Sequence, residues 1–108
     1  MRLAGSWIIG PLILTGVPAS GQPSGDPAAG KAFALQVCTP CHVVAPDQLS
    51  PQRFAVAPDF NAIANTPAMS PMALHAFLSG AHPTMPNLVL SPDEERNVIA
   101  YILSLRHR

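Results

Sequence analysis

The hydrophobic and polar positions of this chain repeat with the spacing of short helices, most clearly near the C-terminus. Four apolar residues there recur at helical spacing and form one continuous face: Val98, Tyr101, Ile102 and Leu105. The preceding residues 91–94, Ser-Pro-Asp-Glu, have the form of a capping box with proline at the first helical position. The pattern therefore predicts a helix that starts after Ser91 and buries this face.

An earlier helix is predicted from Asp26-Pro27, a capping side chain followed by proline, to about Val37. Phe33 and Val37 lie about one turn apart and are expected to face inward. The residues that follow, 43–58, are rich in Pro, Asp, Gln and Ser and show no sustained period. This composition predicts an irregular loop.

Two shorter helices are expected in the middle of the chain. Residues 59–65 place three apolar side chains on one face: Phe60, Ile63 and Ala64. Ser70-Pro71 repeats the cap-plus-proline start, and the helix it opens should end at Gly80 and turn Leu74, Phe77 and Leu78 inward. Residues 81–90 read as another loop. Because no segment alternates in the manner of a strand, the predicted fold class is all-α.

The N-terminal residues differ in composition from the rest of the chain. Arg2 gives a positive start, residues 3–17 are mostly apolar, and Val17-Pro18-Ala19 offers small residues to a signal peptidase. We therefore expect a signal peptide over residues 1–19, a flexible linker over 20–25 and a single domain over 26–108. An uncleaved membrane anchor is the alternative, but a span needs about 20 apolar residues, and this stretch is shorter and interrupted by prolines.

The distinctive chemistry lies in residues 38–42, Cys-Thr-Pro-Cys-His, which contain both cysteines of the 108-residue chain. A CxxCH run is typical of a c-type haem attachment site. The spacing lets both sulfurs form thioethers with the vinyl groups of one haem, and the adjacent imidazole can bind its iron. We therefore expect Cys38 and Cys41 to attach one haem c covalently and His42 to be the proximal iron ligand.

Three other interpretations of this run are a disulfide, a zinc half-site and a thioredoxin-like redox pair. A redox pair is expected near a βαβ pattern, and no such alternation flanks the motif. Zinc needs two further ligands, and the remaining histidines do not have HxxxH spacing: His75, His82 and His107. Haem attachment is therefore the favoured interpretation.

A haem used for electron transfer needs a second axial ligand, and Met85 is the expected one. It lies in a proline-braced loop, residues 82–87, from which a thioether can reach the iron. His82 in the same loop is the alternative. The remaining candidates are interpreted as core-filling methionines and surface histidines: Met69, Met72, His75 and His107.

Charge excludes some partners. The six basic and six acidic side chains balance, and loss of Arg2 with the signal peptide leaves a net charge of −1. No basic stripe is present for nucleic acid. Since Lys31 is the single lysine, encounters with partners should depend little on salt and more on an apolar patch at the haem edge.

With these residues in place, the chain resembles the class I c-type cytochromes of the small bacterial kind over most of residues 26–106. The resemblance rests on features in a fixed order: Gly30, the CxxCH at 38–42, Ala-Pro-Asp-Phe at 57–60, Met-Pro-Asn-Leu at 85–88 and Val-Ile-Ala-Tyr-Ile at 98–102. It implies the cytochrome c fold, in which three to five short helices pack around one covalently bound haem.

The resemblance also implies roles for single residues. Gly30 would permit the first and last helices to cross closely, with Tyr101 as the aromatic side chain at the crossing. The carbonyl of Pro58 would accept a hydrogen bond from His42 and so fix the orientation of the ligand. On this basis Pro58 joins Cys38, Cys41, His42 and Met85 as a cofactor-binding residue.

The function that follows is one-electron transfer between two redox proteins by an exported, periplasmic carrier that is not itself an enzyme. One alternative is a gas-binding or sensing haem protein whose sixth iron position is open or weakly ligated. Another is the small cytochrome subunit of a periplasmic dehydrogenase. We expect a monomer or a subunit of a redox complex, without stable membrane insertion and without nucleic acid.

Overall fold

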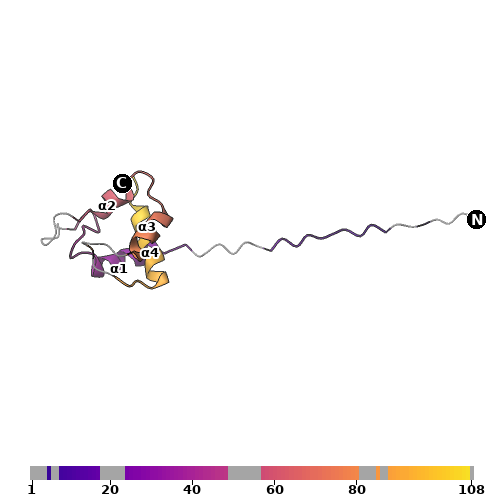
Figure 1. Cartoon of the computed structure of the whole chain (residues 1–108), viewed down its shortest axis with the longest axis horizontal. Helices are drawn as coiled ribbons and strands as arrows, with labels where there is room; N and C mark the ends of the chain where they lie inside the picture. The colour runs from indigo at the N-terminus through magenta and orange to yellow at the C-terminus, as the bar shows by residue number, and fades with distance from the viewer. Residues whose placement is uncertain are drawn as a thin grey trace, which may run out of the picture.

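The computed structural model describes residues 5, 8–17, 24–48, 57–80, 85 and 88–107, and every regular element within these ranges is a helix. The helices are α1 (Pro27–Val37), α2 (Phe60–Ala64), α3 (Pro71–Ser79) and α4 (Pro92–Ser104). Figure 1 shows them gathered into one body, from which residues 8–17 extend away. The predicted all-α fold class is confirmed.

Each helix begins at a side chain that caps it. The carboxylates of Asp26 and Asp59 and the hydroxyl of Ser70 each accept a hydrogen bond from a first-turn N–H, at 2.9, 2.5 and 3.0 Å. Ser91 and Glu94 form the predicted capping box, with bonds of 3.2 and 2.8 Å. A cap of this kind contributes about 1 kcal/mol to the stability of a helix. These local signals explain why the helix starts agree with the sequence-based prediction.

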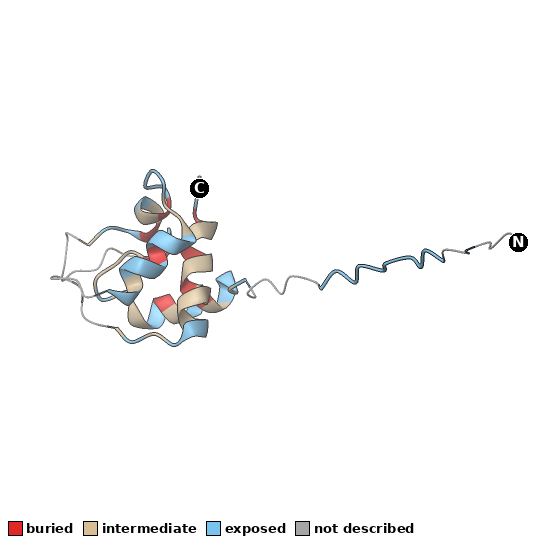
Figure 2. Cartoon of the chain, turned by 45° about the vertical axis from the view of Figure 1, so that its right-hand side comes forward, coloured by how far each residue is buried: buried red, intermediate tan, exposed pale blue. Residues whose placement is uncertain are grey.

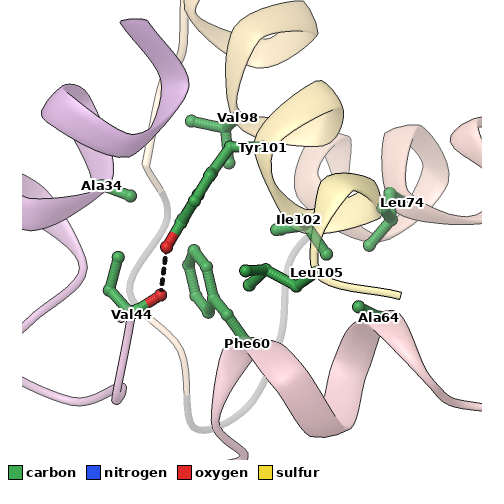
Figure 3. Packing of buried hydrophobic residues seen from close by; sticks show 9 residues of the cluster. All are labelled: Ala34, Val44, Phe60, Ala64, Leu74, Val98, Tyr101, Ile102 and Leu105. Carbon is green, nitrogen blue, oxygen red and sulfur yellow. Dashed lines mark hydrogen bonds between the residues drawn. The ribbon is translucent and has the colours of Figure 1, made fainter. Parts of the chain in front are cut away.

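Helix α4 is the centre of the fold, because it packs against the other three helices and most extensively against α1. The four residues of its predicted apolar face are all buried: Val98, Tyr101, Ile102 and Leu105. They meet buried residues of the other helices in one cluster, including Ala34 of α1, Phe60 of α2 and Leu74 of α3 (Figure 3). Figure 2 shows this buried surface along the inner faces of the helices.

Two glycines allow the chain to approach α4 unusually closely. A Cβ atom at Gly30 would lie 1.9 Å from the carbonyl oxygen of Asn97, and one at Gly25 would lie 2.0 Å from that of Arg96. The backbone N–H of Asp26 also donates to Oδ1 of Asn97 at 2.8 Å. The close crossing implied for Gly30 is therefore present. Packing against α4 already begins at Gly25, the last residue of the expected linker.

Some expected side-chain directions differ from the structure. Phe33 and Val37 are only half-buried, since α1 meets α4 through its small residues Gly30 and Ala34. Phe77 was expected on the inner face of α3 but is 53 % exposed. Leu74 is the buried residue of α3.

The apolar N-terminal stretch lies outside the core. Its large side chains are 80–90 % exposed: Ile8, Ile9, Leu12, Ile13, Leu14 and Val17. Among the described residues, no helix has the length and apolar character needed to cross a bilayer. The expected signal peptide and its cleavage after Ala19 stay predictions, and residues 18–23 lie outside the described ranges.

A buried hydrogen bond joins α4 to the loop after the CxxCH segment. The hydroxyl of Tyr101 donates to the carbonyl oxygen of Val44 at 2.7 Å, and both residues are buried (Figure 3). Burial, and secondarily the negative charge of Asp47, raises the pKa of the Tyr101 phenol. The neutral phenol is therefore favoured in the folded protein.

This raised pKa predicts a loss of stability at alkaline pH. A phenol that ionises at higher pH in the folded than in the unfolded chain stabilises the fold fully below the unfolded pKa of about 10, and this contribution declines as pH rises through the folded pKa. We expect the free energy of unfolding to fall over that alkaline range. Urea titrations at increasing pH measure it, with phenolate absorbance reporting the only tyrosine of the chain.

Tyr101→Phe is the control for this prediction. It removes the titrating group, so its unfolding free energy should start lower at neutral pH, because the Val44 carbonyl loses its partner, but decline less with pH. Equal alkaline declines in the two proteins would assign the effect to another group.

Candidate haem-attachment site

The CxxCH segment adds one further turn to the end of α1. The N–H of Cys38 donates to the carbonyl of Ala34 at 2.8 Å, and the N–H of His42 donates to that of Cys38 at 2.9 Å. The hydroxyl of Thr39 donates to the last turn of α1 at 3.0 Å. One short turn therefore carries Cys38, Cys41 and His42.

Both cysteines are half-buried and are not joined by a disulfide. Burial, with a smaller effect of Cys41, raises the pKa of the Cys38 thiol to about 11. Because the thiolate is the reactive and metal-binding form, this pKa is unfavourable for a thiol redox pair or a zinc ligand. Within the described ranges, no group of three or more His, Cys, Asp or Glu side chains is placed to hold a metal ion. The raised pKa of Cys38 therefore gives no support to a thiol redox pair.

The imidazole of His42 is oriented by a backbone carbonyl on another segment. Its Nδ1 donates to the carbonyl oxygen of Pro58 at 2.6 Å, the hydrogen bond that the family resemblance implies. A carbonyl can only accept, so the proton lies on Nδ1 and the lone pair of Nε2 is left for a metal. Histidine ligands in metal sites are typically held in this way.

The ring of His42 also rests against the buried core. Its centroid lies 5.5 Å from that of Phe60, which in turn lies 6.3 Å from that of Tyr101, both in tilted arrangements. Phe60 is 4 % exposed, and its N–H donates to the carbonyl of Val43 at 2.9 Å. Helices α2 and α4 therefore support His42 from one side.

The backbone that follows His42 is held by a residue that the sequence interpretation missed. The side-chain amide of Gln48 hydrogen-bonds both to the carbonyl of His42 and to the N–H of Val44. Gln48 lies in the segment expected to be an irregular loop, where the residues show no periodic pattern. No signal in a single sequence distinguishes it from a solvated glutamine.

Met85, the expected second axial ligand, lies in the loop between α3 and α4 and is half-buried. The alternative ligand His82 lies outside the described residues. Met69 is partly buried against the core, as expected of a core-filling methionine, but Met72 is 80 % exposed, so the same interpretation is wrong for it. Met72 points away from the core because the inner face of α3 carries Leu74 instead.

The two histidines expected at the surface are exposed. His75 lies on α3 with 65 % of its side chain exposed, and its Nδ1 hydrogen-bonds to Oε1 of Glu95 on α4. His107 follows α4, and its backbone N–H donates to Oδ1 of Asn65 at 2.7 Å. These placements leave His42 as the histidine that the described fold orients beside the two thiols.

The residues present fit a covalently attached haem. Two unpaired thiols share a turn with an imidazole whose tautomer and orientation are fixed, and a half-buried methionine lies in a separate loop. Thioether formation needs the first feature, and axial ligation of iron by protein side chains needs the others. An all-α domain with such a site belongs to the class of c-type haem proteins.

The comparison with known proteins identifies the family. Cytochrome c-552 of Bradyrhizobium diazoefficiens is 40 % identical to this chain over 81 residues, which make up 75 % of the chain and 76 % of the relative. No family model matches the chain, and no solved structure matches it. The chain belongs to the small c-type cytochromes. It accordingly carries covalent haem c and is an electron-transfer protein.

Proposed function

We propose that this cytochrome is a periplasmic one-electron carrier whose single haem is attached through Cys38 and Cys41 and ligated by His42 and Met85. The observation that carries the proposal is the 2.6 Å hydrogen bond from Nδ1 of His42 to the carbonyl of Pro58, beside two unpaired thiols. When bound, haem c takes up and releases one electron at its iron.

The residues of the chain then have separate tasks. The carbonyl of Pro58 keeps the proton on Nδ1 of His42 and raises the basicity of the ligating nitrogen. Phe60 limits movement of the ring. The thioether of Met85 is a neutral ligand of the kind that raises the midpoint potential. His42 and Met85 would both bind the iron and so leave no coordination site for a substrate, which is why we propose a carrier rather than a complete enzyme.

Export is the second part of the proposal. It is supported by the apolar residues 8–17, whose exposed side chains contribute nothing to the core, and by the small residues up to Ala19. Cytochrome c domains with a low net charge and one exposed lysine, here Lys31, should meet their donor and acceptor with little long-range steering. The carrier acts alone or as the small subunit of a redox complex.

The Met85 assignment predicts a spectroscopic signature. The protein, produced in a host that matures c-type cytochromes, should show the near-infrared charge-transfer band of methionine ligation when oxidised. Met85→Ala should lose this band and lower the midpoint potential by on the order of 0.1 V or more, within the roughly 0.8 V that axial ligands span. Absorption spectra and a potentiometric titration measure both effects.

Met72→Ala is the matched control, because Met72 is 80 % exposed on α3. It should keep both the band and the potential. If wild type lacks the band although haem is attached, His82 becomes the leading ligand. If wild-type reduced protein rapidly and completely binds carbon monoxide at neutral pH, the iron is open and a gas-binding function replaces the carrier.

A further inference from the structure

The backbone immediately after the CxxCH turn is held by hydrogen bonds from several segments. The carbonyl of Val43 accepts from Phe60 of α2, and the carbonyl of Val44 accepts from Tyr101 of α4. Two further groups, the carbonyl of His42 and the N–H of Val44, are both satisfied by Gln48. Three separate segments therefore fix residues 42–44.

Gln48 makes its two contacts from a tight turn. Its own N–H donates to the carbonyl of Ala45 at 3.0 Å, which returns the chain toward His42. Its Oε1 then accepts from the N–H of Val44 at 2.7 Å, and its Nε2 donates to the carbonyl of His42 at 3.0 Å. The residue is half-buried, so water competes weakly for these bonds.

A primary amide is the side chain that suits this position. The backbone offers one donor and one acceptor, and an amide supplies the complementary pair in one plane. A carboxylate could serve the N–H of Val44 but would face the carbonyl of His42 with a second acceptor. A methionine of similar length could serve neither.

We propose that Gln48 is a positioning residue for the axial ligand, which sets the orientation of His42 and through it the midpoint potential. This inference rests on the proposed function, in which His42 binds the iron. Gln48 fixes the peptide plane that follows His42, while Pro58 holds the far end of the same residue through Nδ1. His42 is thus held at its backbone by Gln48 and at its side chain by Pro58.

The direction in which the midpoint potential should change follows from the hydrogen bond between His42 and Pro58. If the peptide after His42 is free to rotate, the ring tilts and the bond from Nδ1 to the carbonyl of Pro58 lengthens. The ligating nitrogen then becomes less basic and stabilises the oxidised iron less. Loss of the two Gln48 hydrogen bonds should therefore raise the midpoint potential.

The test compares Gln48→Met with Gln36→Met in the matured holoprotein. Gln36 is exposed on α1, the helix that leads into the CxxCH turn. The control therefore makes the identical change without altering the hydrogen bonds of Gln48. We expect Q48M, poised at the wild-type midpoint potential, to contain more reduced than oxidised protein, and Q36M to contain equal amounts. Paramagnetic NMR of the oxidised proteins should show moved His42 ring resonances in Q48M only.

Ser91→Ala separates positioning from general destabilisation. It removes the capping hydrogen bond to the N–H of Glu94 at the start of α4 and should lower the unfolding free energy, but it leaves every contact of residues 42–44 in place and the potential unchanged. Should Q48M yield no holoprotein, Gln48→Glu loses only the bond to His42. Its ring resonances then give the readout, since its added charge would itself alter the potential.

The outcomes distinguish the two proposals. Wild-type protein without the signature of histidine and methionine ligation would overturn the proposed function, whatever the Gln48 variants do. Wild-type protein with that signature, together with Gln48 variants that match it in potential and in His42 resonances, would overturn the positioning role alone.

Discussion

Gly30→Ala is expected to destabilise the folded holoprotein by about 3 kcal/mol, the upper part of the usual range for overpacked interiors. The added Cβ would lie 1.9 Å from the carbonyl oxygen of Asn97 and 2.9 Å from the N–H nitrogen of Val98. Both are backbone atoms of α4, which cannot rotate away as a side chain can. Helix propensity alone favours alanine by about 1 kcal/mol, so only a tight crossing gives a net loss. Urea unfolding followed by far-UV circular dichroism measures the change.

Ala32→Gly is the control for Gly30→Ala, because Ala32 is exposed on the same helix. It makes the reverse change away from α4 and should cost only the propensity difference of about 1 kcal/mol. If G30A is instead as stable as wild type, or more stable, α1 and α4 do not cross at the distance described, and the role implied for Gly30 fails.

The parts of the fold that could be predicted are those encoded within one helix. Helices α1, α3 and α4 begin at the capping residues that the sequence predicts, which are Asp26, Ser70 and Ser91. The apolar face of α4 is buried, as its spacing predicts. The errors concern contacts between segments. Phe77 is exposed although its spacing places it near Leu74, the buried residue of α3, and Gly25 is packed because α4 passes close to it. Neither outcome is visible in a local pattern.

The same distinction applies to the site. Residues 38–42 are a local motif, and the resemblance supplied Pro58, whose carbonyl does meet Nδ1 of His42. Gln48 was missed because its contacts join a side chain to the backbone inside an aperiodic loop. Such contacts leave no periodicity and depend on the turn at Ala45. Ligation by Met85 stays a prediction, since the loop position of a methionine fixes no bond to iron.

His42→Ala should produce the largest change in the chemistry of the haem. Cys38 and Cys41 are unchanged, so the protein should still carry covalent haem, visible as added mass. The imidazole that Pro58 orients is lost, and alanine offers no ligand in its place. We therefore expect the reduced protein to bind carbon monoxide and the midpoint potential to move by on the order of 0.1 V or more. Mass spectrometry, absorption spectra with and without carbon monoxide, and potentiometry measure these effects.

His75→Ala makes the same substitution on α3, where the side chain is exposed and pairs with Glu95 rather than facing the CxxCH turn. It should retain the wild-type spectrum, potential and resistance to carbon monoxide, because the exposed His75 side chain lies on α3, outside the CxxCH turn and its contacts. A wild-type spectrum in H42A would show that another side chain binds the iron. The Pro58 contact would then be structural, and the axial assignment would have to be rebuilt around the loop of His82 and Met85.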